Sequence, residues 1–298
     1  MQCPVCENKD VLNLIETWKE YKLYHCHKCD VVFSDPMKNP GTEWYEKSEM
    51  YAVGKIIQVE LSWHHKQFLS DNDFYGSMLL DIGCGRGIFL NEAKRKGYKV
   101  WGIDFDKDNI KIAKERYGLE NVYVMSVEKL SNKFLQEKFD IISFFEVLEH
   151  LDNLSQFIEQ IKKILKPKGY IVLSVPNRDR TLDTLGEYDY PPNHLTKWNK
   201  NCLTSFLERS GFEVVKSVVK KLDAEDVSLY LKSKIRFGIT KRLARRGIDA
   251  NKQDNIYMAA NLMRSKNLVF KVLALPVIPI LSIPLLQGAG LYEVARLK

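Results

Sequence analysis

Three groups of residues in this 298-residue sequence could carry out chemistry: paired cysteines, a glycine-rich turn, and a few acids and histidines. The cysteines come as two Cys-x-x-Cys pairs separated by nineteen residues. This is the spacing of a zinc ribbon, in which two short turns bring four thiolates into a tetrahedron. We therefore predict a structural zinc, with no open position for metal chemistry, held by Cys3, Cys6, Cys26 and Cys29.

The glycine-rich turn lies in LLDIGCGRGIFL, residues 79–90, where Asp81 precedes glycines at 83, 85 and 87. Such a turn between a buried strand and a helix lets the backbone approach a nucleotide, because no Cβ stands in the way. The third glycine is one position away from that of a dinucleotide fingerprint, which disfavours NAD. An acid two residues before the first glycine favours a ligand with an ammonium group, such as S-adenosylmethionine. Asp104, at the end of the next apolar run, could accept both ribose hydroxyls of either ligand.

The third group follows the later apolar runs. Glu146, Glu149 and His150 come after the fourth predicted strand, at the crevice where open α/β sheets bind ligands. His194, in PPNHLTKW, follows the fifth. Histidine suits proton removal because its ordinary pKa of about 6.5 lies near neutral pH. We predict His194 as the base, with a turn-fixing role as its alternative; His150 has a capping role as its alternative.

The elements that must position these residues alternate along the chain. Short apolar runs separated by segments of helical spacing occupy residues 78–82, 99–104, 121–125, 139–145 and 170–175. This alternation predicts a parallel sheet built from βαβ units. Helices are expected at Lys55–Leu69 and at about 200–210. FEVVKSVVK and GLYEVAR predict a sixth and a seventh strand.

Composition and charge indicate the class of protein and the way its segments are organised. With 45% hydrophobic and 28% charged residues, the chain is typical of a globular protein, and unpaired Cys84 and Cys202 suit a reducing, cytoplasmic compartment. The net charge of +7 is concentrated after residue 215, where sixteen Lys or Arg stand against six Asp or Glu. The predicted segments are a zinc ribbon at 1–35, a connector at 36–53, a main domain at 54–220 with 289–298, and an insert at 221–288.

Five stretches together resemble class I S-adenosylmethionine-dependent methyltransferases: LLDIGCGRG, VWGIDFDKDNIKIAKERYG, FDIISFFEVLEHL, LKPKGYIVLSVPN and HLTKWNKNCLTSFLERSGF. The resemblance implies a doubly wound, seven-stranded α/β sheet whose last strand is antiparallel. It also implies S-adenosylmethionine as cofactor, Asp81 and Gly83 near its methionine part, Asp104 on its ribose, and Ser126 to Glu128 beside its adenine. The complete set of residues expected to bind the cofactor is Asp81, Gly83, Cys84, Gly85, Gly87, Asp104, Phe105, Ser126, Val127, Glu128 and Glu146.

One missing motif and two further resemblances limit the class of acceptor. Enzymes that methylate amino groups of bases carry a Pro-Pro-aromatic motif after the fourth strand, where this chain has FFEVLEH. The loop of His194 resembles that of sugar and quinone O-methyltransferases, and a similar ribbon precedes the methyltransferase domain in enzymes of polysaccharide biosynthesis. We predict O-methylation of a sugar, a glycolipid, a lipid-linked glycan or a related small molecule, with His194, His150 and Glu149 as catalytic residues.

Three other functions stay open. An RNA methyltransferase is disfavoured because residues 1–35 hold four Lys against six Asp or Glu, whereas a phosphate-binding module should be positive. A polyprenyl-quinone O-methyltransferase and a non-catalytic S-adenosylmethionine-binding protein are the others. In the insert, a basic amphipathic helix near 231–246 and a proline-broken apolar run at 272–286 predict a lid or a peripheral contact, through 231–286, with the inner face of the membrane.

Overall fold

A computed structural model of the chain describes residues 1–47, 60–71, 76–133, 138–231, 234 and 286–298. The N-terminal part of the helix predicted at Lys55–Leu69 lies outside these residues. So does most of the insert predicted at 221–288, with nearly all of its basic helix and apolar run. Residues 224–231, at the start of the insert, are helical.

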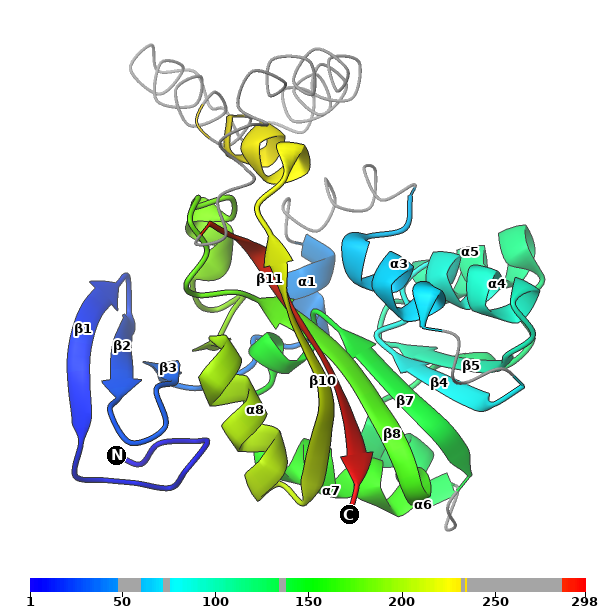
Figure 1. The fold of residues 1–298 in the computed structure, drawn as a ribbon, viewed down its shortest axis with the longest axis horizontal. Helices are drawn as coiled ribbons and strands as arrows, with labels where there is room; N and C mark the ends of the chain where they lie inside the picture. The colour runs from blue at the N-terminus through cyan, green and yellow to red at the C-terminus, as the bar shows by residue number, and fades with distance from the viewer. Residues whose placement is uncertain (48–59, 72–75, 134–137, 232–233, 235–285) are drawn as a thin grey trace.

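Seven strands form one sheet in the order β10-β11-β8-β7-β4-β5-β6 (Figure 1). Their bounds are β4 Met78–Ile82, β5 Lys99–Asp104, β6 Val122–Val124, β7 Phe139–Phe145, β8 Leu165–Pro176, β10 Phe212–Lys221 and β11 Gln287–Leu297. Strands β4 to β8 pair in parallel, whereas β11 is antiparallel to both its neighbours, β8 and β10. The predicted α/β sheet with an antiparallel last strand is confirmed.

Helices cover both faces of this sheet. Their bounds are α3 Trp63–Ser70, α4 Ile88–Arg95, α5 Lys107–Tyr117, α6 Val127–Lys133, α7 Leu154–Ile164 and α8 Lys200–Arg209. Apolar side chains of α3, α4 and α5 share one core cluster, and those of α6, α7 and α8 share another. Neighbouring strand residues divide between the two clusters, Ile141 with the first and Ile142 with the second. Since successive side chains of a strand point to opposite faces, the sheet is buried on both sides, as the predicted doubly wound fold requires.

A second sheet of four strands has the order β1-β2-β3-β9. Its strands are β1 Leu12–Trp18, β2 Tyr21–Cys26, β3 Val32–Asp35 and β9 Thr196–Lys197. The first three belong to the predicted ribbon, but β9 comes from the loop after β8, and Val32 pairs with Lys197 and Phe33 with Thr196. The ribbon therefore shares a sheet with the main domain, which its separate placement in the sequence did not predict. The adjoining connector also contains a helix, α1 Thr42–Lys47.

Two strand ends differ from the sequence-based expectation. Strand β8 begins at Leu165, five residues before the apolar run that predicted it, because Leu165 already pairs with Phe139 of β7. Strand β11 begins at Gln287, ahead of GLYEVAR, where it runs beside Lys221 of β10. Both extensions are rich in polar residues or glycine, so the apolar signal does not reach them.

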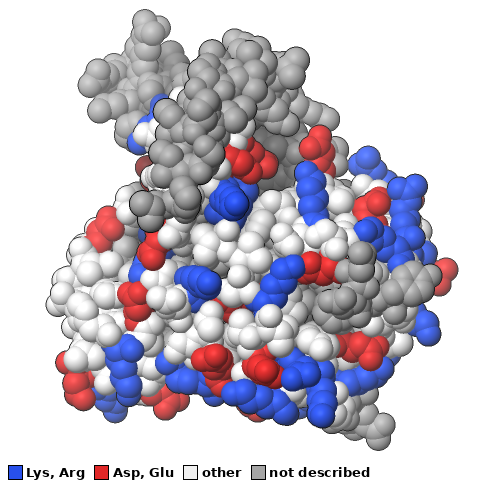
Figure 2. All heavy atoms as spheres, in the orientation of Figure 1, with Lys and Arg blue, Asp and Glu red and all other residues white. Residues whose placement is uncertain are grey.

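Charge on the surface is mixed. Figure 2 shows Lys and Arg side chains interspersed with Asp and Glu on the displayed face, most densely along its lower edge. Much of the positive charge that the sequence concentrates after residue 215 falls on residues outside the described part. Among the described helices, none is long and apolar enough to cross a membrane.

Candidate active site

The glycine turn joins β4 to α4 at the carboxyl ends of the parallel strands. Gly83 has a φ of 78°, and a Cβ on it would stand 2.8 Å from Cγ2 of Val147. Gly87 has a φ of 77°, and a Cβ there would stand 2.6 Å from Cδ1 of Leu119. Only glycine suits these two positions, because the left-handed backbone and the lack of space both exclude a side chain. A Cβ on Gly85, by contrast, would meet nothing within 4 Å, so the turn is open beside Gly85, at the edge of the sheet where open α/β sheets bind ligands.

Asp104 ends β5 beside this turn. Its Oδ2 accepts the backbone N–H of Gly85 at 2.9 Å, and its Oδ1 accepts that of Asp106 at 2.8 Å. Burial raises the pKa of Asp104, while these two backbone hydrogen bonds act in the opposite direction. Each carboxylate oxygen has a second lone pair. The side chain can therefore hold the turn in place and still accept a hydroxyl of a ligand.

Asp81 and Cys84 lie deeper than the turn itself. Asp81 is 3% exposed, its Oδ1 accepts from Oγ of Ser143 at 2.7 Å, and burial raises its pKa to about 8. The side chain of Cys84 points toward β5, where a Cβ on Gly102 would meet its Sγ at 2.8 Å. Cys84 therefore has only its backbone to offer to a ligand.

Phe105, predicted to bind the cofactor, and Ser126 to Glu128, predicted beside its adenine, follow the next two strands of the sheet. Phe105, just after β5, is 37% exposed, and its ring centroid lies 5.3 Å from that of Tyr45 in α1. Ser126 follows β6, and its Oγ accepts a backbone N–H of the first turn of α6 at 3.3 Å. Val127 and Glu128 begin that helix. All four residues thus lie near the strand edge that carries the glycine turn, and their contacts with a cofactor stay predictions.

Glu146 directly follows β7 and has a φ of 55°, a conformation that non-glycine residues rarely adopt and that clusters at functional sites. Its Oε1 accepts from Oγ of Ser174 at 2.7 Å and lies 3.9 Å from Nδ1 of His64. Burial raises its pKa to about 7. The side chain is nevertheless 39% exposed, so a ligand can reach it.

His194 is buried on the loop after β8, and its Nδ1 lies 3.0 Å from Oδ1 of Asp189. Arg180 donates to the other oxygen of Asp189 at 2.7 Å, and Lys197 lies 3.5 Å from it. Burial alone would raise the pKa of Asp189, but the hydrogen bond with His194 and the two cations lower it below its ordinary value. Because a carboxylate only accepts, Nδ1 of His194 donates to it, and in the neutral imidazole Nε2 keeps a lone pair.

His150 and Glu149 lie in the short 3-10 helix Leu148–His150 after β7. Nδ1 of His150 lies 2.6 Å from the carbonyl oxygen of Asn193, so it donates there and leaves a lone pair on Nε2. Burial lowers the pKa of His150 to about 3. Its ring centroid lies 4.9 Å from that of His194.

Glu149 is 1% exposed, and neither of its carboxylate oxygens has a hydrogen-bond partner within the described residues. Burial and the nearby charge of Glu146 raise its pKa well above the ordinary value. A buried carboxyl without donors is costly unless it is protonated or paired with a cation. One ligand atom each from Glu149, His150 and His194 lies within 4.8 Å of the others. Carboxylate oxygens and imidazole nitrogens are ligands of divalent metals, so this group could hold one.

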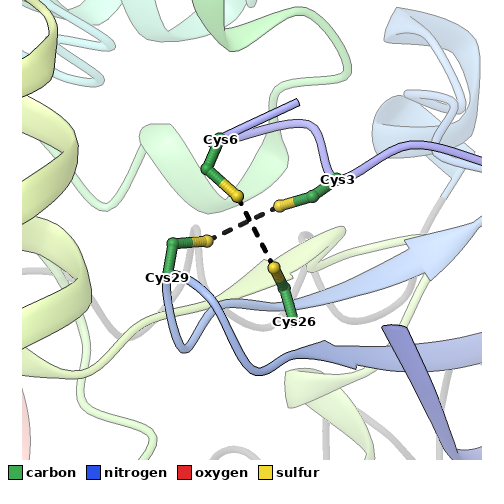
Figure 3. A group of neighbouring side chains, drawn as sticks. All are labelled: Cys3, Cys6, Cys26 and Cys29. Carbon is green, nitrogen blue, oxygen red and sulfur yellow. Dashed lines mark hydrogen bonds between the residues drawn. The ribbon is translucent and has the colours of Figure 1, made fainter. Parts of the chain in front are cut away.

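The four predicted zinc ligands meet at the start of the chain. Figure 3 shows their sulfur atoms pointing toward one another from the N-terminal turn and from the turn between β2 and β3. The Sγ atoms of Cys3 and Cys29 lie 3.6 Å apart, as do those of Cys6 and Cys26. Tetrahedral zinc with Zn–S bonds of about 2.3 Å requires sulfurs roughly 3.8 Å apart. The residues therefore fit the metal that their spacing predicts.

Sequence reasoning missed two residues of this site. Tyr45 of α1 is 5% exposed, and its ring centroid lies 6.0 Å from that of His150, so with its contact to Phe105 it joins the two halves of the site. Nothing in the sequence indicated Tyr45, because α1 is only six residues long and lies in a segment that contains Pro and Gly and was predicted as a connector. Asp189 was also missed, although an acid five residues before a candidate base was a usable signal.

Comparison with known proteins assigns a family to this geometry. A family model described as a methyltransferase domain matches residues 57–217, more than half of the chain. The chain belongs to this methyltransferase family. The predicted resemblance is thereby confirmed, and the matched residues include the glycine turn, Asp104 and both histidines of the site. The four clustered cysteines of this methyltransferase lie outside the match.

Curated relatives match up to about half of this methyltransferase. A protein named ubiquinone biosynthesis O-methyltransferase from Rickettsia bellii is 28% identical over 148 residues, which are 48% of this chain and 60% of that protein. A protein of the same name from Bartonella bacilliformis is 39% identical over 109 residues, 35% of this chain and 43% of that protein. The chain thus spans about half the length of the curated relatives it matches.

A solved structure shares the fold. Phosphoethanolamine N-methyltransferase 2 from Haemonchus contortus, in complex with S-adenosyl-L-methionine, superposes with a TM-score of 0.55 at 16% sequence identity. The superposition covers 86% of this methyltransferase and 59% of the Haemonchus chain. At this identity the likeness concerns the fold alone.

Proposed function

We propose that this methyltransferase transfers the methyl group of S-adenosylmethionine to a hydroxyl group of a small molecule. The observation that carries the proposal is the buried pair of His194 and Asp189, joined at 3.0 Å. A hydroxyl must lose its proton as its oxygen attacks, and an unassisted hydroxyl is a poor nucleophile at neutral pH. The pair supplies an imidazole whose tautomer is set by a carboxylate, as a general base requires.

The cofactor would lie across the glycine turn. Asp104 would accept the ribose hydroxyls with its remaining lone pairs, and Asp81 and Gly83 would lie nearest the methionine part. The residues beside the adenine would be Phe105 and Ser126 to Glu128. The open space beside Gly85 and a buried acid ending the next strand support this placement.

Methyl transfer in this site is an in-line displacement. The acceptor oxygen forms a bond to the methyl carbon as the bond between that carbon and the sulfonium sulfur breaks, and the sulfur keeps the electron pair. The hydroxyl proton passes to Nε2 of His194, which becomes an imidazolium facing Asp189. The products are S-adenosylhomocysteine and a methyl ether. The contribution of the protein is to hold the two reactants in this alignment and to receive the proton.

A divalent cation is the second arrangement that the geometry supports. Glu149, His150 and His194 would hold it, and the orphaned carboxylate of Glu149 is the observation that favours it. A bound cation would lower the pKa of an acceptor hydroxyl as a Lewis acid. Dialysis against a chelator distinguishes the two arrangements: turnover that is lost and then restored by Mg²⁺ or Zn²⁺ supports the cation, and unchanged turnover supports His194 as base alone. Zinc in the cysteine site must be quantified in parallel.

The acceptor class is proposed from different observations. The names of the curated relatives favour a hydroxyl of a quinone precursor. The sugar, glycolipid or lipid-linked glycan predicted from the sequence is the other class. An RNA acceptor is disfavoured because residues 1–35, which we call the cysteine module, hold four Lys against six Asp or Glu. Incubation with S-adenosylmethionine and either a catechol or a polyprenyl-linked sugar, followed by mass spectrometry, tests the two classes. A gain of one methyl group on either probe supports O-methylation, whereas cofactor binding without turnover of any acceptor supports the non-catalytic alternative.

We also propose that Cys3, Cys6, Cys26 and Cys29 bind a structural zinc. The sulfur separations support this, and four thiolates leave no coordination position for a substrate. The cytoplasmic location and the membrane contact through 231–286 stay predictions.

A further inference from the structure

Asp30 connects the cysteine module to the loop that carries His194. It directly follows Cys29, and its backbone has a left-handed φ of 63°, held by the hydrogen bond of its N–H to the carbonyl oxygen of Cys26 at 2.7 Å. The turn that positions two of the four thiolates therefore also positions the carboxylate of Asp30. Oδ1 of this carboxylate lies 2.6 Å from Nε2 of His25 in its own module, and the carboxylate also meets residues of the main domain.

Apart from His25, the side-chain partners of Asp30 lie at the two ends of one loop. Arg178, two residues after β8, donates from Nη2 to Oδ1 of Asp30 at 3.0 Å and from Nη1 to the backbone carbonyl of Asp30. Asn199, just before α8, donates from Nδ2 to Oδ2 at 2.5 Å. The backbone N–H of Arg178 also donates to the carbonyl of Trp198 at 2.7 Å. Residues 178–199 thus form a closed loop, and one carboxylate of the cysteine module binds both of its ends.

The same loop is also attached to the cysteine module by backbone hydrogen bonds just before its second end. Ser34 donates its backbone N–H to the carbonyl of Leu195 at 2.9 Å, and the pairing of β3 with β9 follows directly. Leu195 in turn donates its N–H to the carbonyl of Glu149 at 2.8 Å. His194 is therefore one residue away from a backbone path that runs from the cysteine module to the other side of the site.

We propose that Asp30 is a positioning residue of the active site: by binding Arg178 and Asn199 it keeps the loop 178–199 closed and His194 in register with Glu149 and His150. The cysteine module is then part of the acceptor site rather than an appended domain. The proposal rests on the proposed role of His194. Because the side chain of Asp30 is 43% exposed, its contribution to global stability is small. Asp30 instead controls how often the loop 178–199 opens locally.

Hydrogen–deuterium exchange with mass spectrometry tests this on the full chain without knowledge of the acceptor. In Asp30→Ala, peptides covering 186–197 should exchange roughly tenfold faster, as expected when opening requires one or two fewer hydrogen bonds to break. Peptides covering 78–104 should exchange as in the wild type, zinc content should be unchanged, and S-adenosylhomocysteine affinity should stay within a factor of about three. Asp10→Ala, an exposed acid of the same module, is the matched control and should change none of these.

A double variant sharpens the test. Arg178→Ala should accelerate exchange in the same peptides. Because the two residues share an ion pair, the acceleration in Asp30→Ala combined with Arg178→Ala should be smaller than the product of the two single effects. With a catechol as probe, Asp30→Ala should lower kcat while the KM for S-adenosylmethionine is unchanged. Unaltered loop exchange in Asp30→Ala, loss of zinc from it, or multiplicative effects in the double variant would overturn the proposal. If the wild type fails to methylate any probe, the proposed function fails, yet exchange still decides the role of Asp30.

Discussion

Leu195 donates its backbone N–H to the carbonyl oxygen of Glu149 at 2.8 Å. This bond joins the loop after β8 to the 3-10 helix after β7, two segments that lie far apart in the sequence. It brings His194, the neighbour of Leu195, to within 4.9 Å of the ring of His150. The site is therefore assembled from two strand ends, as expected where ligands bind at the carboxyl edge of an open sheet.

The role of His194 as base predicts a specific kinetic loss. His194→Ala should lower turnover about 10²- to 10⁴-fold, the usual contribution of general-base catalysis. Affinity for S-adenosylmethionine should change by no more than a factor of a few, because the proposed site has His194 contact the acceptor and not the cofactor. Steady-state kinetics with calorimetry measures both. His27→Ala, an exposed histidine of the cysteine module, is the control. A His194→Ala enzyme with more than half the wild-type rate would move the role to His150 or Glu149.

Asp189 should affect turnover by setting the tautomer of His194. Asp189→Asn replaces an acceptor by a group that can donate, so the imidazole can adopt the other tautomer and lose its free Nε2 lone pair. We expect turnover to fall by at least about tenfold while the cofactor affinity is retained. The comparison of kcat with the dissociation constant of S-adenosylhomocysteine checks this. Equal rates for wild type and variant would mean that Asp189 serves only its ion pairs with Arg180 and Lys197.

Asp104 should control cofactor affinity. Asp104→Ala should weaken binding of S-adenosylmethionine by about 1.5 to 3 kcal/mol, the usual value for hydrogen bonds to a charged group, or roughly 10- to 150-fold. Calorimetric titration measures the change. Asp108→Ala, an exposed acid on the next helix, should leave affinity unaltered. Wild-type affinity in Asp104→Ala, or tight NAD binding by the wild type, would refute the assignment.

The arrangement of the four cysteines predicts that the protein contains zinc. The protein purified without chelator should contain one zinc per chain, because structural zinc contributes directly to folding. Cys3→Ser or Cys29→Ser should lose the metal and disorder the cysteine module while S-adenosylmethionine still binds, since the glycine turn lies on the other sheet. Elemental analysis and calorimetry measure these outcomes. Absence of zinc from the wild type would contradict the assignment.

Glu293 of β11 predicts a pH dependence of stability. It is 1% exposed, its Oε1 accepts from Thr204 at 2.6 Å and from Ser217 at 3.0 Å, and burial raises its pKa to about 7. The folded state therefore holds this proton more tightly than the unfolded state. As pH rises from about 4.5 to about 7, the free energy of unfolding should fall by up to about 3 kcal/mol on account of this group.

Substitution isolates this contribution. Glu293→Gln stays neutral, so its free energy of unfolding should exceed that of the wild type increasingly between pH 5 and pH 8, as urea titrations can measure. Glu213→Gln, whose side chain is 53% exposed in the native protein, serves as the control and should follow the wild type. Parallel pH dependences for Glu293→Gln and the wild type would show that this carboxyl does not titrate as described.

The strands could be read from the sequence because their signal is local. Runs of apolar residues mark β4, β5 and β7 with the observed bounds, since nearly all of β4 and β7 and the carboxyl half of β5 are buried. The position of His194 and His150 after strands was sufficient to select them as candidates. Strand β9 could not be predicted, because two residues carry no periodicity and its pairing with β3 is a tertiary contact. The interactions of Asp189 and Asp30 depend on the same loop geometry.

Transfer of a tritium-labelled methyl group from S-adenosylmethionine to a catechol or a polyprenyl-linked sugar tests the central claim most directly. We predict label on an oxygen of one acceptor with the wild type, formation of an equal amount of S-adenosylhomocysteine, and a loss of at least about a hundredfold in rate with His194→Ala. Label on neither acceptor, or equal labelling by wild type and His194→Ala, would contradict an O-methyltransferase that uses His194 as its base.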